Sequence, residues 1–372
     1  VYRIICEMMN MKEINIARKL ATKRREKGIT QEELALYIGV SKASVSKWET
    51  GHSYPDITFL PQLATYFNIS IDELMGYSPQ MTKEDIKKLY HQISSSFASE
   101  NFEDVLLECR KIIKEYYSCF PLLLQLALLL ANHHMLADGK KEQEDILNEA
   151  TKLCIRIRRH SDDVWLLKEA TSVEAVCYLM LQQPQEILNL LGESIRPILT
   201  DYEVIGQAYQ MMGNISKAKE IAQVSMYQHL LALIGSTPAY LMLNADDNNK
   251  IEEILYRSLA VAEIYDLDRL HPNTMAQIYL SAAQIYSLQK NSEKAFDMLG
   301  KYTKICTTNF FPFSLHGDSY FDEIDNWLAD LDLGPNAPRN EKVIKEDMLK
   351  AILSNPAFTF LSDNPRYKSI VE

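Results

Sequence analysis

Residues 28–51 read GITQEELALYIGVSKASVSKWETG, and this stretch decides the fold of the N-terminal part of the chain. Thr30 and Glu33 have the spacing of a capping box, which predicts a helix beginning just after Thr30. Gly39 supplies a tight turn, and Ser41 is placed to cap a second helix over Lys42–Glu49, which ends at Thr50-Gly51. Two short helices joined by a glycine-containing turn are typical of a helix-turn-helix unit.

Three further helices are predicted around this unit. An amphipathic pattern covers Glu13–Lys27, and apolar positions predict helices over Ile57–Phe67 and Ile71–Met75. Residues 11–76 are therefore predicted to form a small five-helix domain. The side chains expected in its core include Leu34, Ala35, Val45 and Trp48.

The ordered motifs of this segment resemble those of the xenobiotic-response-element family, which includes the Cro/CI repressors. The motifs are GITQEELA at 28–35, IGVS at 38–41, VSKWETG at 45–51, FNI at 67–69 and DEL at 72–74. The resemblance implies an all-α DNA-binding domain and a transcriptional regulator that binds a double-stranded DNA operator.

The resemblance also implies which residues contact base edges. Lys42, Ala43 and Lys47 fall at positions where this family contacts the major groove, and Ser46 lies beside them. Lysine can donate to guanine O6 and N7, and alanine can contact a thymine methyl group. The well-known phage repressors carry glutamine at the positions of Lys42, Ala43 and Lys47, so their operator sequences cannot be transferred to this chain.

Two further residues are expected to contact the DNA backbone. Gln31 occupies the place of a glutamine that contacts phosphate in the family, and Ser44 lies next to the base-contacting positions. Arg24 is expected instead to form a structural ion pair with Glu49, as the family pattern implies. The remaining bases of the first helix are interpreted either as phosphate contacts or as a solvated face; they are Arg18, Lys19, Lys23 and Arg25.

The overall charge argues against nucleic-acid binding by the whole chain. The net charge is −11, yet residues 11–75 hold nine Lys/Arg against eight Asp/Glu, so the acidic excess lies beyond the first domain. None of the six cysteines forms a C-x-x-C pair, so no metal site is expected. We expect the thiols to be reduced and mostly buried, as in a cytoplasmic protein. No cofactor is expected, and no apolar segment is long enough to span a membrane. The common phosphate-binding, dinucleotide-binding, zinc-protease and nucleophile-elbow motifs are missing, which argues against an enzyme.

Beyond the first domain, the sequence predicts helices almost without interruption. Residues 77–82 are interpreted as a linker, 83–338 as a tetratricopeptide-like helical repeat domain, and 339–372 as helices that cap the array; residues 1–10 are expected to be an extension without function. One repeat unit is predicted from Tyr202, Gly206, Tyr209, Gly213, Ala218 and Ala222. A second is predicted from Tyr279, Ala283, Tyr286, Ala295 and Leu299, and a weaker third from Ala175, Tyr178, Ile187, Leu191 and Pro197. Such units are expected to stack into a curved solenoid.

A repressor-type domain followed by tetratricopeptide repeats resembles the peptide-sensing regulators of Gram-positive bacteria. The resemblance implies a signalling peptide or protein effector bound in a groove of the repeats, for which the candidate residues are Glu203, Gln207, Gln210, Gln277, Leu280 and Gln284. A fixed dimerisation scaffold without a ligand is the alternative for the repeats. A homodimer on a palindromic operator is expected, because two half-sites about one helical turn apart supply specificity. The alternative for the whole chain is a protein-interaction adaptor, or a toxin–antitoxin or phage-related module, with purely structural repeats.

Overall fold

The computed structural model describes residues 15–76, 81–195 and 201–371. The all-α prediction is confirmed: these residues contain no β-strand, and they form only one isolated bridge, between Ser314 and Asn336. The predicted N-terminal extension over residues 1–10, most of the 77–82 linker and Pro197 lie outside the described residues. None of the described helices is long and apolar enough to cross a membrane.

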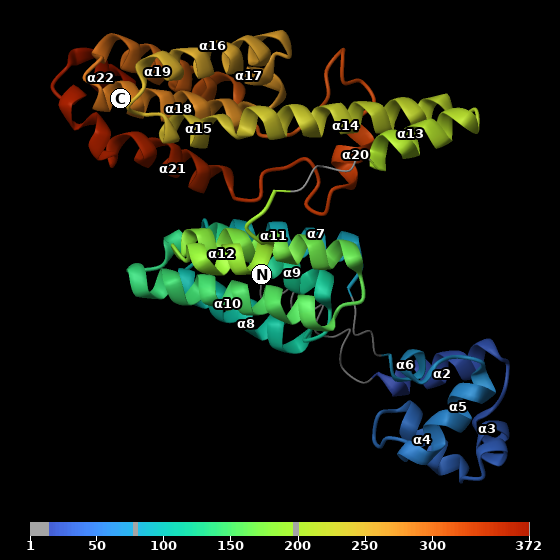
Figure 1. Ribbon diagram of the computed structural model, residues 1–372. Coiled ribbons are helices and arrows are strands. Elements are labelled where there is room, and N and C mark those ends of the chain that lie inside the picture. Colours follow the sequence, from blue (N-terminus) through green and yellow to red (C-terminus); the bar gives the residue numbers. More distant parts are fainter. Residues whose placement is uncertain (1–14, 77–80, 196–200, 372) are drawn as a thin grey trace. The chain divides into compact units, whose positions relative to one another are not determined.

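The N-terminal domain has the predicted helices (blue in Figure 1). They are α2 (Ile16–Glu26), α3 (Gln31–Ile38), α4 (Lys42–Glu49), α5 (Leu60–Phe67) and α6 (Ile71–Met75), with a short 3₁₀ turn η1 (Ile57–Phe59) before α5. The capping box of α3 is complete, since the Thr30 hydroxyl accepts from the Glu33 N–H and the Glu33 carboxylate accepts from the Thr30 N–H. Gly39 has a φ of 82°, a left-handed conformation that suits glycine in the turn between the two helices.

One apolar core holds these helices together. Leu34 and Val45 are completely buried, and Trp48 is 5% exposed, so α3 and α4 are fixed to each other through the residues that the sequence predicts. Leu20 from α2, Leu63 from α5 and Leu74 from α6 complete the same cluster. Burial of a leucine side chain stabilises the folded state by about 1.5–3 kcal/mol. These few side chains therefore fix the orientation of α4 relative to the other helices of the domain.

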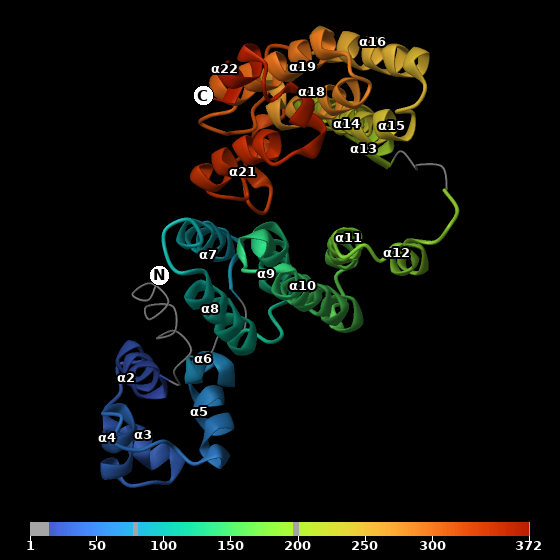
Figure 2. The same ribbon diagram turned by 90° about the vertical axis from the view of Figure 1, so that its left-hand side faces the viewer.

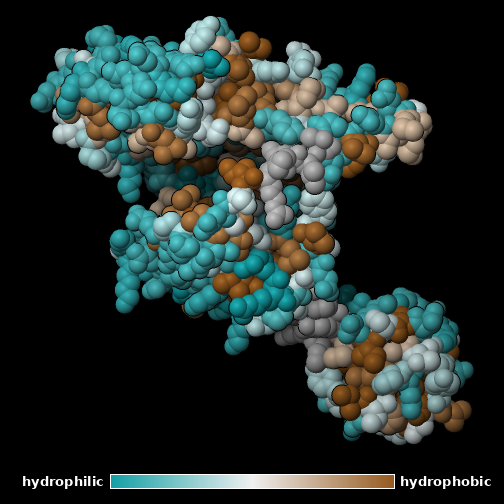
Figure 3. All heavy atoms as spheres, in the orientation of Figure 1, coloured by the Kyte–Doolittle hydropathy of each residue, from teal (hydrophilic) through white to brown (hydrophobic). Residues whose placement is uncertain are grey.

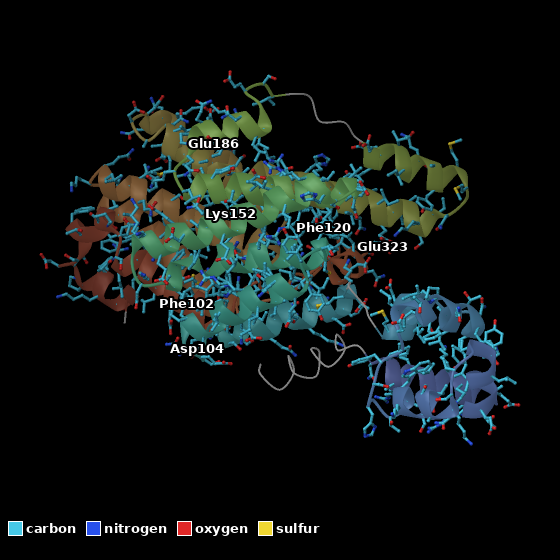
Figure 4. The ribbon with its side chains drawn as sticks, turned by 90° about the horizontal axis from the view of Figure 1, so that it is seen from below. Phe102, Asp104, Phe120, Lys152, Glu186 and Glu323 are labelled. Atoms are coloured by element: carbon cyan, nitrogen blue, oxygen red, sulfur yellow. The ribbon has the colours of Figure 1, made fainter. Side chains whose placement is uncertain are left out.

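By its internal contacts, the chain divides into two compact units, and the division falls between Glu186 and Ile187. In the first unit, the domain just described is followed by α7 (Lys83–Ser96), α8 (Phe102–Glu115), α9 (Phe120–His133), η2 (His134–Leu136), α10 (Lys140–His160) and α11 (Val164–Met180). The helix α9 packs along α10 and also contacts α7 and α11 (Figure 2). Phe102 and Asp104 mark the start of α8, and Phe120 marks the start of α9 (Figure 4).

The weakest predicted repeat, whose residues fall on both sides of this division, is only loosely formed. Ala175 and Tyr178 lie on α11, which packs mainly against α10. Ile187 and Leu191 lie on α12 (Pro184–Leu191), a helix that buries none of its residues. The helix–turn–helix order of the prediction is therefore present, but the close crossing expected of a tetratricopeptide hairpin is found between α10 and α11 instead.

The second unit contains the two stronger predicted repeats. Its elements are α13 (Asp201–Met211), α14 (Ile215–Gly235), α15 (Thr237–Leu243), α16 (Asn248–Ile264), α17 (Leu267–Leu270), α18 (Pro272–Leu288), α19 (Ser292–Lys304), η3 (Ile305–Asn309), α20 (Asp325–Asp330), α21 (Glu341–Leu353), η4 (Pro356–Leu361) and α22 (Pro365–Val371). The pairs α13–α14 and α18–α19 each form a closely packed hairpin. Ala283 and Ala295 are completely buried in the second of these, as small residues at a helix crossing should be.

Gly206 marks the crossing of α13 with α14. A Cβ built at this position would lie 3.7 Å from Ile221 Cγ2 and 3.9 Å from the Ala218 carbonyl oxygen, so a methyl group fits there in ordinary van der Waals contact. We expect Gly206→Ala to stabilise the hairpin by up to about 1 kcal/mol, because alanine favours helix over glycine. Gly206→Leu should destabilise it by about 1–3 kcal/mol through overpacking. Hydrogen exchange of peptides from 201–222 measures both effects, and equal protection in the two variants would contradict the predicted crossing.

Most of the described cysteines are buried, as the sequence predicts. Cys109, Cys119, Cys154 and Cys177 are buried free thiols, whereas Cys306 is partly exposed. Burial raises the pKa of Cys109 to about 12 and that of Cys177 to about 11, so both remain protonated near neutral pH. These thiols fill the packing between helices and are poor nucleophiles.

Candidate nucleic-acid interface

The four predicted base-contacting residues share one face of α4. At about 100° per residue, Lys42, Ser46, Ala43 and Lys47 cover an arc of about 140°. Val45 and Trp48 lie on the opposite side and are buried. Lys42, Ala43 and Lys47 are exposed, and Ser46 is partly exposed. The helix therefore presents two cations, a methyl group and a hydroxyl on one accessible surface.

Two serine side chains cap the N-terminus of α4. The Ser41 hydroxyl accepts from the Ser44 N–H at 3.1 Å, and the two serine hydroxyls lie 2.9 Å apart. Ser44, predicted to contact the DNA backbone, thus takes part in the cap in this structure. A hydroxyl both donates and accepts, so its use in the cap leaves further hydrogen-bonding capacity.

An ion pair ties the far end of α4 to α2, as the sequence predicts. Arg24 Nε and Nη2 donate to the two carboxylate oxygens of Glu49 at 2.5 and 3.0 Å. Arg24 Nη1 also donates to the Ile29 carbonyl oxygen at 2.7 Å. The Arg24 and Glu49 side chains are 14% and 5% exposed, so Arg24 is a structural residue of the domain and is withdrawn from the surface.

Gln31 joins the same network, which the sequence did not indicate. Its Nε2 donates to Glu49 Oε2 at 2.8 Å, so Glu49 connects α4 to the first turn of α3 as well as to α2. An amide nitrogen carries two hydrogens, and the second is available to a phosphate. The predicted contact of Gln31 with the DNA backbone thus stays a prediction, and the side chain is already oriented for it by Glu49.

The ionisation of this network follows from its burial and its hydrogen bonds. Burial raises the pKa of Glu49, but hydrogen bonds from Arg24 and Gln31 outweigh burial and hold the pKa below its ordinary value. The hydrogen bond to Glu49 raises the pKa of Arg24 above its ordinary value. Both groups are therefore charged near neutral pH, and the pair keeps α2, α3 and α4 in one arrangement.

Lys42 has an exposed acidic neighbour that lies ten residues before it in the sequence. Its Nζ lies 3.3 Å from Glu32 Oε2, and the two side chains are 62% and 76% exposed. An ion pair this exposed contributes little, so a phosphate or a base edge can replace Glu32. Glu32 is thus a negative charge beside the predicted contact surface. It could be recognised only once the fold had placed the start of α3 next to the start of α4.

The bases of α2 differ in their surroundings. Lys23 lies 3.1 Å from Glu73 and 3.5 Å from Glu26, and the hydrogen bond to Glu73 raises its pKa. The side chains of Arg18, Lys19 and Arg25 are exposed. Lys23 is thus paired with two acids in this structure, and all four bases keep both interpretations, phosphate contact or solvated face.

The surface of α4 is polar, although the domain exposes apolar side chains elsewhere. Figure 3 shows hydrophobic patches among the hydrophilic surface of this domain. Leu36, Tyr37, Tyr54 and Ile57 are the most exposed of its large apolar residues, and none of the large exposed apolar residues of the described domain lies on α4. A cationic, hydrogen-bonding helix face suits phosphate and base edges better than an apolar protein partner.

The six candidate residues for effector binding fall on two separate hairpins. Glu203, Gln207 and Gln210 are exposed on α13, which packs on α14. On α18, Gln277 is exposed, and Leu280 and Gln284 are partly buried. These positions do not show whether the six residues line one groove, so the effector site stays a prediction.

The comparisons with known proteins concern mainly the N-terminal domain. The family model described as helix-turn-helix matches residues 20–74. The chain is 36% identical over 81 residues to the HTH-type transcriptional activator BcrR of Enterococcus faecalis, which is 20% of this chain and 40% of the relative. It is 27% identical over 94 residues to the HTH-type transcriptional regulator ImmR of Bacillus subtilis, covering 25% of this chain and 74% of the relative.

A third relative is the cryptic phage CTXphi transcriptional repressor RstR of Vibrio cholerae, 38% identical over 63 residues, which are 17% of this chain and 56% of the relative. The segment aligned with BcrR covers less than half of the length of that relative. Among solved structures, the apo form of the competence regulator ComR from Streptococcus vestibularis aligns with 86% of this chain and 98% of its own. Its identity of 14% and TM-score of 0.24 do not establish a common arrangement.

Proposed function

We propose that this chain, whose residues 20–74 match the helix-turn-helix family, is a DNA-binding transcriptional regulator that recognises a specific operator sequence. The observation that carries the proposal is the face of α4, on which Lys42, Ala43, Ser46 and Lys47 are accessible while Val45 and Trp48 anchor the helix in the core. Curated relatives of this segment are described as a transcriptional activator, a regulator and a repressor, which supports the class of function but not its direction.

The proposal includes a cytoplasmic homodimer on a palindromic operator. A helix of the length of α4 can contact only a few base pairs in one major groove. Two copies of the domain, bound to half-sites about one helical turn apart, would double the number of base contacts. The helical array after residue 82 is proposed to hold the two copies together.

We further propose that the helical array binds a peptide or protein effector. The support is physical: α13 and α18 each expose amide side chains, namely Gln207 and Gln210 on one helix and Gln277 on the other. An amide can both donate to and accept from a peptide backbone. A scaffold without an effector is the competing proposal, and thermal stabilisation by the cognate peptide would separate the two.

The direct test of DNA binding is a fluorescence-anisotropy titration of the full chain. The DNA is the region upstream of its own gene, and a shuffled duplex of the same composition is the control. The upstream DNA should bind more tightly than the shuffled duplex, and its affinity should fall steeply between about 50 and 200 mM salt as counterions are released. Equal affinity for both duplexes at every salt concentration would overturn the proposal.

Removal of the acidic neighbour of Lys42 should strengthen binding. Glu32→Gln frees Lys42 from its ion pair and takes one negative charge away from the DNA-facing surface. The affinity for the upstream DNA should rise by up to about fivefold, the upper end of what an exposed pair contributes. Glu33→Gln is a poor control because Glu33 completes the cap of α3, so Glu26→Gln on α2 serves instead. An unchanged or lower affinity in Glu32→Gln would place Glu32 away from the DNA.

A further inference from the structure

The second unit contains a cavity of about 720 Å³ that the proposed regulator function does not use. One side of its wall is formed by the end of α16 and by α17, from Ile264 to Leu270. The other side is the loop 316–320, which precedes α20, so segments far apart in the sequence meet around one space. A volume of this size falls within the range of about 300–1,000 Å³ that small-molecule sites occupy.

The loop side of the cavity is held in one conformation by contacts outside the wall. The Gly317 N–H donates to Asp325 Oδ1 at 2.6 Å, and the Glu323 N–H donates to Gln223 Oε1 of α14 at 2.8 Å. A Cβ at Gly317 would lie 2.0 Å from the Phe321 carbonyl oxygen, so the turn accepts only glycine. A ligand would therefore meet a loop that is already ordered, which lowers the entropic cost of binding.

The charged side chains of the wall itself leave one carboxylate without a cation. Asp266 and Arg269 form an ion pair, with Asp266 Oδ2 3.8 Å from Arg269 Nη1, so their charges offset each other. Asp318 forms no ion pair with any described residue, and its Oδ1 accepts from two backbone N–H groups of its own loop at 2.8 and 2.7 Å. With His316 counted as neutral, two aspartates against one arginine give the wall a net charge of −1. This charge favours a cation.

The unused hydrogen-bonding atoms of the loop side are acceptors. Asp318 Oδ2 and the Ser319 hydroxyl have no hydrogen-bond partner among the residues that the structure describes. His316 Nδ1 lies 2.8 Å from the Gly317 carbonyl oxygen, and because a carbonyl oxygen only accepts, Nδ1 carries the hydrogen of the uncharged ring. His316 Nε2 is then an acceptor as well. A primary ammonium group has three donors and no acceptor, and it matches these three atoms.

Two tyrosine rings lie beside these acceptors. Tyr265 and Tyr320 both line the cavity, and their ring centroids are 5.7 Å apart at an interplanar angle of 68°. The face of a tyrosine ring attracts an ammonium ion and also covers hydrocarbon. Ile264 and Leu270 add apolar wall on the helical side. The cavity therefore combines an unpaired carboxylate, unused acceptors and aromatic faces, which together suit an organic cation.

We propose that this cavity binds a small organic ammonium ion, with the ammonium group at Asp318 and the apolar body against Tyr265 and Tyr320. A carboxylate ligand would be repelled by Asp318, and it would have to displace Asp266 from Arg269. A neutral alcohol would lack both the charge and two of the three donors. The proposal is independent of the DNA-binding function.

The test is calorimetric titration of the full chain with three ligands of similar size, phenethylammonium, phenethyl alcohol and phenylacetate. We expect saturable binding of phenethylammonium. The alcohol and the carboxylate should bind at least about tenfold more weakly, because they lose a hydrogen bond between charged groups.

Two pairs of variants locate the site. Asp318→Asn keeps the Oδ1 acceptor that orders the loop but removes the charge, and it should weaken phenethylammonium binding by about tenfold. Glu263→Gln is its control, since Glu263 is an exposed acid of α16 just outside the wall, and the affinity should not change. Tyr320→Leu should weaken binding by about twofold to fivefold through loss of the ring face, and Tyr320→Phe should restore most of the affinity.

Any of three results would overturn the proposal. The first is the absence of saturable phenethylammonium binding, and the second is binding of the alcohol or of phenylacetate with equal affinity. The third is the same affinity in Asp318→Asn and Glu263→Gln, since the ligand would then respond only to general charge. If Asp318→Asn changes the hydrogen exchange of peptides from 310–325, the Tyr320 pair decides, and equal affinity in Tyr320→Leu and Tyr320→Phe contradicts the proposal.

Discussion

Glu49→Ala is expected to destabilise the helix-turn-helix domain by about 3–5 kcal/mol, the cost of leaving one member of a buried ion pair without its partner. The substitution removes a carboxylate that is 5% exposed and leaves the Arg24 guanidinium, 14% exposed, without its charged partner. Gln31 would lose the acceptor of its hydrogen bond at the same time. Because the chain contains several units, the effect is best measured locally, as hydrogen exchange of peptides from 16–76.

The matched control is Glu32→Ala, which also removes an acid that pairs with a base. Glu32 is 76% exposed, so its loss should change the protection of the same peptides very little. Similar loss of protection in the two variants would show that the Arg24–Glu49 pair does not hold α2, α3 and α4 together.

The same pair predicts how the stability of the domain depends on pH. The folded pKa of Glu49 is depressed below its unfolded value of about 4.3, so its contribution is fully present above that value. The contribution is lost as the pH falls through the folded pKa. The advantage of the natural chain over Glu49→Ala should therefore be constant from pH 7 to pH 5 and shrink below about pH 4. An advantage that stays the same at pH 3 would contradict the charged pair.

Lys47→Glu should weaken binding to the operator by at least about 100-fold. A lysine contact with a guanine is worth about 1–3 kcal/mol. The proposed dimer would lose two such contacts and gain two negative charges near phosphate. Lys47 is exposed and its side chain supports no part of the core, so the fold should be unaffected. Anisotropy titration on the same DNA measures the loss.

Lys219→Glu is the control for net charge. Lys219 is an exposed residue of α14, outside the DNA-binding domain, and its substitution changes the charge of the chain by the same amount. Its affinity for the operator should stay within about twofold of the natural chain. Equal losses in both variants would mean that α4 contributes only general charge and does not contact the bases.

The helices of the N-terminal domain were predictable because their signals are local. Thr30 with Glu33, Gly39, and Ser41 each act within four residues, so the bounds of α3 and α4 could be predicted from the sequence. The Arg24–Glu49 pair spans 25 residues and could be predicted only through the family pattern. The hydrogen bond of Gln31 to Glu49 and the pair of Glu32 with Lys42 had no signal, since both depend on the angle between helices.

The repeat region was predictable only where its residues are small or aromatic. Gly206 and the buried Ala283 and Ala295 mark helix crossings, and their hairpins are present. At α12 the spacing was suggestive, but this helix buries no residue, so the sequence pattern alone overestimated its packing. The cavity beside Tyr265 was not predictable, because its wall joins segments whose distance is set by the tertiary fold.

Selection of binding sites from random duplex DNA tests the central claim most directly. The full chain should enrich an inverted repeat with half-sites about one helical turn apart. Lys42→Ala should still enrich the repeat, but it should lose its preference at one base pair of each half-site, because we propose that Lys42 contacts a base edge. Failure of the natural chain to enrich any sequence, or identical preferences in Lys42→Ala, would contradict the assignment of α4 as the helix that recognises the operator.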